Sequence, residues 1–352
     1  MMKDGNLFSS MTARGVAALL LLLAVLVSLP FWASSYVLTV ATTVMFLALI
    51  GQSWNLMLGF AGLLSIGHAL FVGLAGYTSG LLFSKYGVPA IVGLIPGVAV
   101  AVAIAALIGY LGFRFSIAGV YFALLTIAFA ELFRIVIDNT AFLGGAQGLY
   151  LPVTEDGRKG VNLLTLRGDP IMFYYLAMAL AAAALVTCRM LLQSRLGYYW
   201  QAIRDDQEAA QALGINVFRY KMYAVSIAAA MAGVGGVFYA FYQNGLYPDS
   251  TFSVERSIEF TLGPIVGGVG TLFGPIAGAL LLTPLGEFIT EAIGWLKAAR
   301  VIDPALKLNG VKLFIWGIVV VIIVMFKPAG IWPWIRDTLG LVKKPGREED
   351  GQ

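Results

Sequence analysis

The sequence contains one cysteine, Cys188, and one histidine, His68. A single cysteine cannot form a disulfide within the chain, and one histidine with one cysteine cannot build a metal cage. Catalysis of the Ser/His/Asp type would have to use His68, which lies inside an apolar run. The sequence also lacks the Gly-x-x-x-x-Gly-Lys-Ser/Thr pattern that binds nucleotide phosphates, so any ATP that drives this protein binds to another chain. We therefore expect no resident metal, no cofactor and no enzyme activity on this chain.

Charge is scarce as well. Charged residues make up 12% of the chain and hydrophobic residues 59%, whereas about a quarter of the residues of a soluble domain are charged. The 23 basic and 19 acidic residues lie mostly between apolar runs, which is not the clustered basic surface of a nucleic-acid-binding protein. The composition predicts an integral membrane protein that contacts membrane lipid.

The apolar runs have the length of membrane-spanning helices. Such a helix needs ~20 mostly apolar residues, and these runs are far longer than the ~10-residue alternating strands of a membrane barrel. We therefore predict an all-α, polytopic membrane helix bundle of about ten transmembrane helices, some of them broken by Pro264, Pro275 and Pro284. The predicted spans are 15–32, 36–56, 60–84, 90–112, 117–137, 171–192, 220–243, 258–273, 274–299 and 310–327.

Lysine and arginine in the loops predict the orientation. The bias is weak over the whole chain but strong in the short segments 189–221 and 327–347, so both termini are predicted to be cytoplasmic. The predicted membrane-spanning domain covers residues 1–340. It includes an extracytoplasmic loop at 138–170 and a cytoplasmic loop at 193–219, and a charged tail at 341–352 is predicted to be disordered.

Two glycine-rich stretches, residues 59–80 and 263–278, resemble each other faintly and predict two weakly similar halves. Glycines four residues apart allow helix backbones to approach closely in lipid. Interrupted apolar segments at matching places in two halves also indicate a substrate path. The pattern is therefore compatible with helix packing alone and with a path-lining role.

The loop at 193–219 contains a predicted short helix, residues 200–213, which Gly214 would end. A short helix exposed between two spans can dock into a groove on a soluble partner. Glu208, Ala209, Ala210 and Gly214 match the first part of the EAA loop of ABC importer permeases, in which that helix contacts the ATPase. An ordinary amphipathic surface helix is the alternative.

Ionisable residues inside predicted spans are candidates for function. Glu131 and Arg134 share a helix face, and we interpret them as a structural ion pair, with gating or substrate contact as the alternative. Glu287 and Glu291 would repel each other if both were ionised, unless they face water or an interface.

His68 invites a proton relay. A hydrogen bond to a neighbouring helix is the simpler interpretation, with Gln52, Asn55 and Ser65 as candidate polar partners.

Several motifs together resemble the branched-chain amino-acid ABC transporter permeases of the LivM type. The most specific is Ala202-Ile203-Arg204-Asp205-Asp206 running into Ala212-Leu213-Gly214-Ile215-Asn216. The others lie at residues 54–62, 64–69, 119–126, 128–131, 194–197, 267–275 and 327–330, in family order. The resemblance covers nearly the whole chain.

This resemblance implies an importer in the bacterial cytoplasmic (inner) membrane that carries leucine, isoleucine and valine. It implies a second homologous permease subunit, two cytoplasmic ATPase subunits and a periplasmic substrate-binding protein. The expected ATPase-coupling residues are Arg204, Asp205, Glu208, Ala209, Ala210 and Gly214. The expected residues of the translocation path are Ser65, Gly67, His68, Glu131, Gly267, Gly268 and Gly270.

The sequence departs from the family in residues 144–149, where Gly-Gly-Ala-Gln-Gly-Leu replaces Gly-Gly-Thr-Asn-Gly-Leu, and in residues 198–201, where basic residues are common. A urea or short-chain amide permease of the same family is one alternative. His68 argues against it, because glutamine is frequent there in urea permeases. An ion-coupled secondary transporter that uses Glu131 or Glu287 is the other. A membrane-embedded enzyme would need clustered catalytic polar groups, which are scarce.

Overall fold

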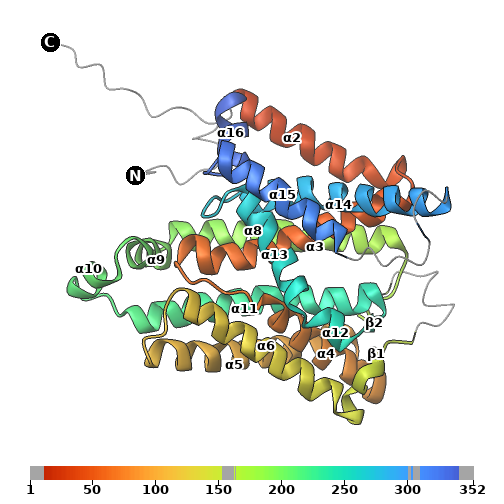
Figure 1. Ribbon diagram of the computed structural model, residues 1–352, viewed down its shortest axis with the longest axis horizontal. Helices are drawn as coiled ribbons and strands as arrows, with labels where there is room; N and C mark the ends of the chain where they lie inside the picture. The colour runs from red at the N-terminus through yellow and green to blue at the C-terminus, as the bar shows by residue number, and fades with distance from the viewer. Residues whose placement is uncertain (1–11, 153–161, 163, 300–302, 304–309, 341–352) are drawn as a thin grey trace.

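The computed structural model describes residues 12–152, 162, 164–299, 303 and 310–340. Most of this described part is helical, and most helices run along one long axis (Figure 1). The predicted tail at 341–352 and residues 153–161 of the predicted extracytoplasmic loop lie outside the described residues. The all-α prediction is confirmed for the part of the chain that the structure describes.

The helices follow one another with short connections. The first half contains α2 (Ala13–Ser28) with η1 (Leu29–Phe31), α3 (Ser35–Asn55) with the π-turn η2 (Leu56–Phe60), α4 (His68–Tyr86), α5 (Ala90–Arg114) and α6 (Val120–Asp138). After the short turns η3 (Ala141–Leu143) and η4 (Gly145–Gln147) and strand β1 (Leu149–Tyr150) come α8 (Pro170–Gln193), α9 (Arg195–Asp205), α10 (Gln207–Ala212) and α11 (Val217–Gln243). Strand β2 (Gly245–Leu246) precedes α12 (Pro248–Thr251), α13 (Val254–Gly267), α14 (Gly274–Ala298), α15 (Val311–Phe326) and α16 (Ile331–Thr338). The two strands pair antiparallel.

Polar side chains begin several of these apolar helices. Asp169 accepts a hydrogen bond from Met172 N, and Pro170 occupies the first turn of α8. Ser253 accepts one from Arg256 N at the start of α13. The first N–H groups of a helix have no partner within it, and lipid offers none, so these caps fix where the helices begin.

Six helices in the described residues are long and apolar enough to cross a membrane: α3 with η2, α5, α6, α8, α11 and α14. A seventh span results if α15 and α16, which are bent by 53°, are counted as one. The multi-pass membrane prediction is therefore confirmed. The number of about ten spans and the two similar halves stay predictions.

Two predicted spans contain irregular segments. The span predicted at 60–84 begins with residues 61–67, here called the first break, which are not helical. The span predicted at 258–273 ends with residues 268–273, the second break. The interrupting residues are glycines rather than prolines: Gly62, Gly268 and Gly270 have positive φ angles. Pro264 and Pro284 lie inside α13 and α14 instead of ending them, which corrects the prediction.

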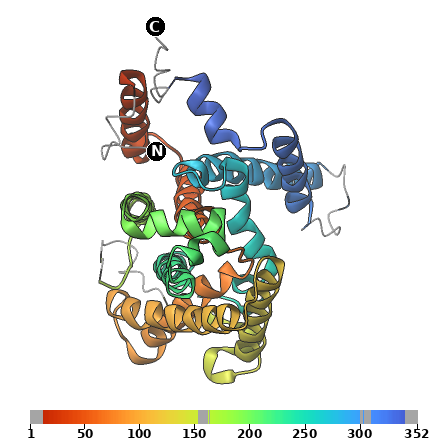
Figure 2. The same cartoon turned by 90° about the vertical axis from the view of Figure 1, so that its left-hand side faces the viewer.

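Helix α3 lies at the centre of the bundle, and its residues from Val44 to Asn55 are all buried. Helices α8, α11, α13 and α14 pack around it, and α4, α5 and α11 form a second layer (Figure 2). The ring of Phe46 on α3 stacks on Phe238 and Tyr239 of α11 and meets Phe260 of α13 edge-on. The broken segments that adjoin α3 are therefore held in the interior.

Glycines lie where the backbones of two helices approach each other closely. A Cβ on Gly76 of α4 would lie 2.8 Å from the carbonyl oxygen of Gly236 on α11. A Cβ on Gly278 of α14 would clash with the backbone of Gly263 on α13. The predicted packing role of the small-residue spacings is confirmed at these crossings.

Helices α9, α10 and α16 lie at one end of the bundle, together with the first turn of α2. Helix α12 and strands β1 and β2 lie at the other end (Figure 1). Thr12 Oγ1 donates a hydrogen bond of 2.7 Å to the carbonyl oxygen of Gly340, so the described ends of the chain meet. We call the first end the α9 end and the second the β end.

Candidate functional site

The first break runs from the α9 end back into the bundle. Its backbone is satisfied by side chains from two helices, α6 and α3, as irregular backbone inside a membrane protein requires. Thr126 Oγ1 of α6 accepts from Ile66 N at 3.2 Å and from Gly67 N at 3.1 Å. Trp54 Nε1 of α3 donates to the carbonyl oxygen of Ser65 at 2.7 Å. Helix α4 therefore starts inside the bundle rather than at its surface.

His68 opens α4 and is fully buried. Ser53 Oγ donates to Ala228 O at 2.6 Å, so it accepts from His68 Nε2 at 2.9 Å, and this arrangement places a proton on Nε2. The expected hydrogen bond to a neighbouring helix is present. Its partner is Ser53, however, and not one of the three predicted residues, because two of those are engaged elsewhere.

Asn55 and Gln52 instead hold the second break. Asn55 Oδ1 accepts from Gly270 N at 2.8 Å, and its Nδ2 donates to Thr271 O at 2.9 Å. Gln52 Nε2 donates to Leu272 O at 2.7 Å. The two glycine-rich stretches, which lie about 200 residues apart in the sequence, therefore meet at the end of α3.

The loop at 193–219 forms two helices, not the single predicted helix over 200–213. The chain breaks at Asp206, whose Oδ1 accepts from Glu208 N at 2.9 Å and from Ala209 N at 3.0 Å. A side chain that satisfies the first N–H groups of α10 ends α9 at this point. Gly214 follows α10 with φ +86°, which confirms the predicted glycine at the helix end.

Helix α9 packs on the bundle through Trp200 and Ile203, and α10 through Ala210, all of which are buried. Trp200 Nε1 donates to Tyr220 O at 2.8 Å. Leu213, by contrast, is 83% exposed. The segment therefore has one face on the bundle and one face that no described residue covers.

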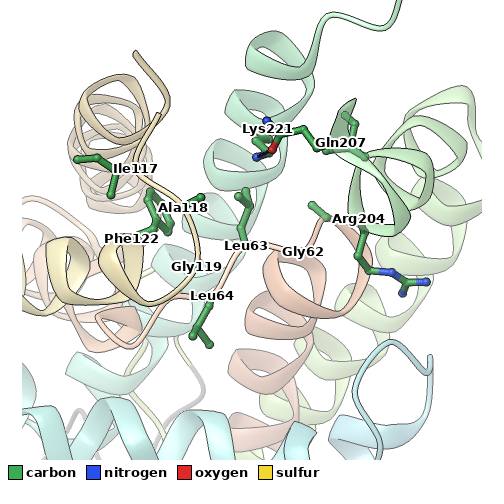
Figure 3. A pocket seen from close by; sticks show the side chains of 12 residues that line it. Gly62, Leu63, Leu64, Ile117, Ala118, Gly119, Phe122, Arg204, Gln207 and Lys221 are labelled. Atoms are coloured by element: carbon green, nitrogen blue, oxygen red, sulfur yellow. Dashed lines mark hydrogen bonds between the residues drawn. The ribbon is translucent and has the colours of Figure 1, made fainter. Parts of the chain in front are cut away.

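Arg204 links this segment to the breaks. Its Nη1 donates to Gly59 O at 2.6 Å, and Asp205 Oδ1 accepts from Nε and Nη2 at 3.2 and 3.1 Å. A cavity of about 210 Å³ opens beside it (Figure 3). Gly62, Leu64, Gly119, Phe122, Gln207 and Lys221 line this cavity. It lies where the first break, α6 and α9 come together.

Glu131 lies apart from both breaks. It pairs with Arg134 at 2.6 Å, and Arg134 also pairs with Asp249 of α12 near the β end. The predicted Glu131–Arg134 ion pair is confirmed. Of the predicted path residues, the structure thus brings Ser65, Gly67 and His68 together at the first break and Gly267, Gly268 and Gly270 at or beside the second, but not Glu131.

A charge network between α13, α14 and α15 was not predicted. Glu259 of α13 is bonded to Arg256 at 2.6 Å and lies 3.4 Å from Lys312 of α15. Lys312 Nζ also lies 3.9 Å from Glu287 of α14. Repulsion between Glu287 and Glu291 was the expectation, but Lys312 partly compensates the charge of Glu287. The sequence offered a signal in Glu259 and Lys312, because both lie inside predicted spans.

A second cavity, of about 500 Å³, opens at the β end between α3, α8 and α11. Arg167 lies at its edge, buried over the rings of Phe83 and Phe241 and bonded to Asn244. Burial lowers the pKa of its guanidinium from the ordinary value. Because Phe83, Arg167 and the end of α11 come from three distant parts of the chain, only the fold reveals this contact.

Comparison with known proteins places the chain in a family. Residues 36–324 match the family model described as branched-chain amino acid transport system / permease component. The chain is 29% identical over 94% of its length to the high-affinity branched-chain amino acid transport system permease protein LivM of Escherichia coli K12, of which it covers 78%. It is 28% identical over the same share to LivM of Salmonella typhimurium, of which it also covers 78%.

A more distant relative is the autoinducer 2 import system permease protein LsrC of Yersinia enterocolitica, 28% identical over 44% of this chain and 45% of that protein. No solved structure matches. The family match covers most of the chain and includes both breaks and the whole α9–α10 segment. This chain therefore belongs to the family of branched-chain amino acid transport system permease components.

Proposed function

We propose that this chain is a permease subunit of an ABC importer that translocates leucine, isoleucine and valine across the bacterial inner membrane. Two cytoplasmic ATPase subunits hydrolyse ATP, a second homologous permease subunit completes the membrane core, and a periplasmic binding protein delivers the substrate. The family match and the LivM relatives support this assignment. No chemical step takes place on this chain.

The observation that carries the proposal is the α9–α10 segment. Its inner face packs on the bundle through Trp200 and Ile203, and its outer face carries Glu208 and Leu213 in the open. A soluble ATPase that receives this outer face can transmit its closure into the membrane domain. The proposed ATPase contact consists of Asp205, Glu208, Ala209 and Gly214. Ala210 is buried and packs α10 against the bundle. The side of the segment that carries the contact residues faces the cytoplasm.

The proposed path runs along the two breaks. Half-helices that start inside a membrane expose their N-terminal N–H groups and are common at substrate sites of transporters. Helix α4 starts inside the bundle at His68, with Ser65 and Gly67 just before it, and the N–H of Ala69 in its first turn donates to Ser257 Oγ at 3.2 Å. Gly267, Gly268 and Gly270 supply the matching backbone on the other side. Glu131 contributes near the β end, beside Arg134.

The order of elements supports the two-half architecture of about ten spans. Helix α3, the first break, α4, α5 and α6 follow one another. Helix α11, residues 244–253, α13, α14 and α15 repeat this order later in the chain, and the second break, between α13 and α14, has no counterpart between α4 and α5. Helix α3 ends at the α9 end, whereas α11 begins there, so the second set runs in the opposite direction (Figure 1). Inverted repeats of this kind are frequent in transporters.

The test is uptake of labelled leucine, urea and ribose by source cells with and without this chain, before and after ATP depletion. We expect loss of the ATP-dependent leucine uptake alone when the chain is removed. Loss of urea uptake instead would move the assignment to an amide permease, and loss of ribose uptake would also refute the substrate. Leucine uptake that survives ATP depletion but collapses with the proton gradient would establish an ion-coupled transporter.

A further inference from the structure

Arg204 occupies the last turn of α9, and its guanidinium points away from the outer face of the α9–α10 segment. Nη1 reaches the carbonyl oxygen of Gly59 in the π-turn that ends α3. Asp205 holds the other side of the guanidinium through Nε and Nη2. Because both edges of the planar group are engaged, its orientation is fixed, as in other charge-assisted arginine contacts.

The same side chain also lies against both breaks. A Cβ on Gly62, in the first break, would lie 3.1 Å from Arg204 Cγ. A Cβ on Gly270, in the second break, would lie 3.3 Å from Arg204 Nη1. Glycine is therefore the residue that lets the arginine sit between the two breaks at this distance. Asn55 accepts a hydrogen bond from Gly270 N, so α3 is also bonded directly to the second break.

The outer residues of the segment behave differently. Glu208 and Leu213 are exposed, whereas the side chain of Arg204 is 38% exposed and bonded inward to Gly59. A single short segment thus presents one set of side chains to solvent and one arginine to the helix breaks. The two sets can be separated by mutation.

We propose that Arg204 is a positioning residue that transmits displacement of α9 to both breaks at once, and that it does not contact the ATPase. The inference rests on the proposed function. When a bound ATPase moves α9, the guanidinium pulls on the Gly59 carbonyl and withdraws from Gly270. The end of α3 and the start of α14 then move together, and the path changes its opening. An arginine is suited to this role because it cannot lose its charge within the membrane boundary.

The experiment uses the importer purified with its partner chains and reconstituted in proteoliposomes with the binding protein. The variants are Arg204→Gln and Arg204→Lys, with Leu213→Asp as the matched change on the outer face. Three quantities are measured: the ATPase subunit that co-purifies, the KM for ATP, and the leucine transported per ATP hydrolysed. Arg204→Gln is expected to keep the first two and to lower the third at least tenfold.

Arg204→Lys keeps one cationic donor for Gly59 and is expected to restore part of the transport ratio, which a purely structural defect would not do. Leu213→Asp is expected to lose the ATPase subunit itself. If Arg204→Gln does not assemble, Arg204→Lys carries the test alone, because its single ammonium group can reach the Gly59 carbonyl but cannot also hold Asp205 through a planar fork. It should lower the ratio less than tenfold at normal ATPase content.

Two results would overturn the inference. An unchanged leucine-to-ATP ratio in Arg204→Gln would mean that the arginine transmits nothing. Loss of the ATPase subunit from Arg204→Gln, to the extent seen for Leu213→Asp, would make Arg204 a contact residue. Failure of the proposed function has a different signature, since the unmodified complex would then contain no ATPase or would move no leucine.

Discussion

Asn55 Oδ1 and Gly270 N are joined by a hydrogen bond of 2.8 Å across 215 residues of sequence. The amide of Asn55 also donates to Thr271, so one buried side chain fixes the second break to the end of α3. Interhelical hydrogen bonds of this kind contribute about 0.6–2 kcal/mol each in a membrane. The pair is therefore suited to set the relative position of the two breaks.

Asn55→Asp separates these two bonds. A carboxylate accepts from Gly270 but cannot donate to Thr271, whereas Asn55→Ala removes both bonds. We expect both variants to melt at a lower temperature than the unmodified protein in detergent, and leucine uptake to fall in both. Equal melting temperatures for all three proteins would show that the amide does not hold the second break.

Gly278 is predicted to be intolerant of any side chain. A Cβ there would clash with the backbone of Gly263, and overpacking of this kind costs about 1–3 kcal/mol. Gly294 in the same helix has nothing within 4 Å of its Cβ position, so it is the matched control. Gly278→Ala should reduce the yield of monodisperse protein in size-exclusion chromatography, and Gly294→Ala should not. Similar profiles for the two variants would contradict the close α13–α14 crossing.

Glu259 is predicted to stabilise the junction of α13 and α15. Its side chain is 14% exposed and lies between Arg256 and Lys312, so Glu259→Gln leaves two cations facing each other. Breaking a buried pair costs up to about 3–5 kcal/mol. The double variant Glu259→Gln with Lys312→Met restores the net charge and should unfold at a higher temperature than Glu259→Gln alone. Additive losses would argue against coupling between the two residues.

Gly214 is predicted to need a residue that accepts the left-handed conformation. A side chain with a branched Cβ at φ +86° costs about 1–2 kcal/mol, whereas asparagine tolerates this region better. Gly214→Val should misplace the end of α10 and lower ATP-dependent leucine uptake, and Gly214→Asn should retain most of it. Uptake in the valine variant at the level of the unmodified protein would exclude a role for this turn in coupling.

The helical membrane architecture could be predicted because run length and apolarity suffice for it. The helix starts at Asp169 and Ser253 carry local capping signals, and the glycine spacings of α13 and α14 indicated the close crossing. The breaks were harder to predict. The apolar pattern continues through residues 61–67. Only the positive φ at Gly62 and the hydrogen bonds that Ile66 N and Gly67 N donate to Thr126 reveal that the helix has ended.

The sequence predicted several residues of the site but not the hydrogen bonds that join them. His68, Gly270 and Arg204 could be singled out from residue type and position, but nothing local predicts that Asn55 bonds Gly270 or that Arg204 bonds Gly59. These contacts join segments at least 145 residues apart. The same reason explains why the contact between Glu259 and Lys312 was missed, since the two residues lie 53 residues apart and meet only when α13 and α15 pack.

The hydrogen bond between Asn55 and Gly270 also has a consequence for membrane insertion, because Gly270 is synthesised long after Asn55. Helix α3 leaves the ribosome before Gly270 exists, and 215 residues separate them. At ~5–20 residues per second, the amides of Gln52 and Asn55 wait about 10–40 s for the second break to be synthesised. During that interval α3 is a membrane segment with unsatisfied polar groups, so its retention depends on the translocation machinery or on early neighbours until the last third of the chain arrives.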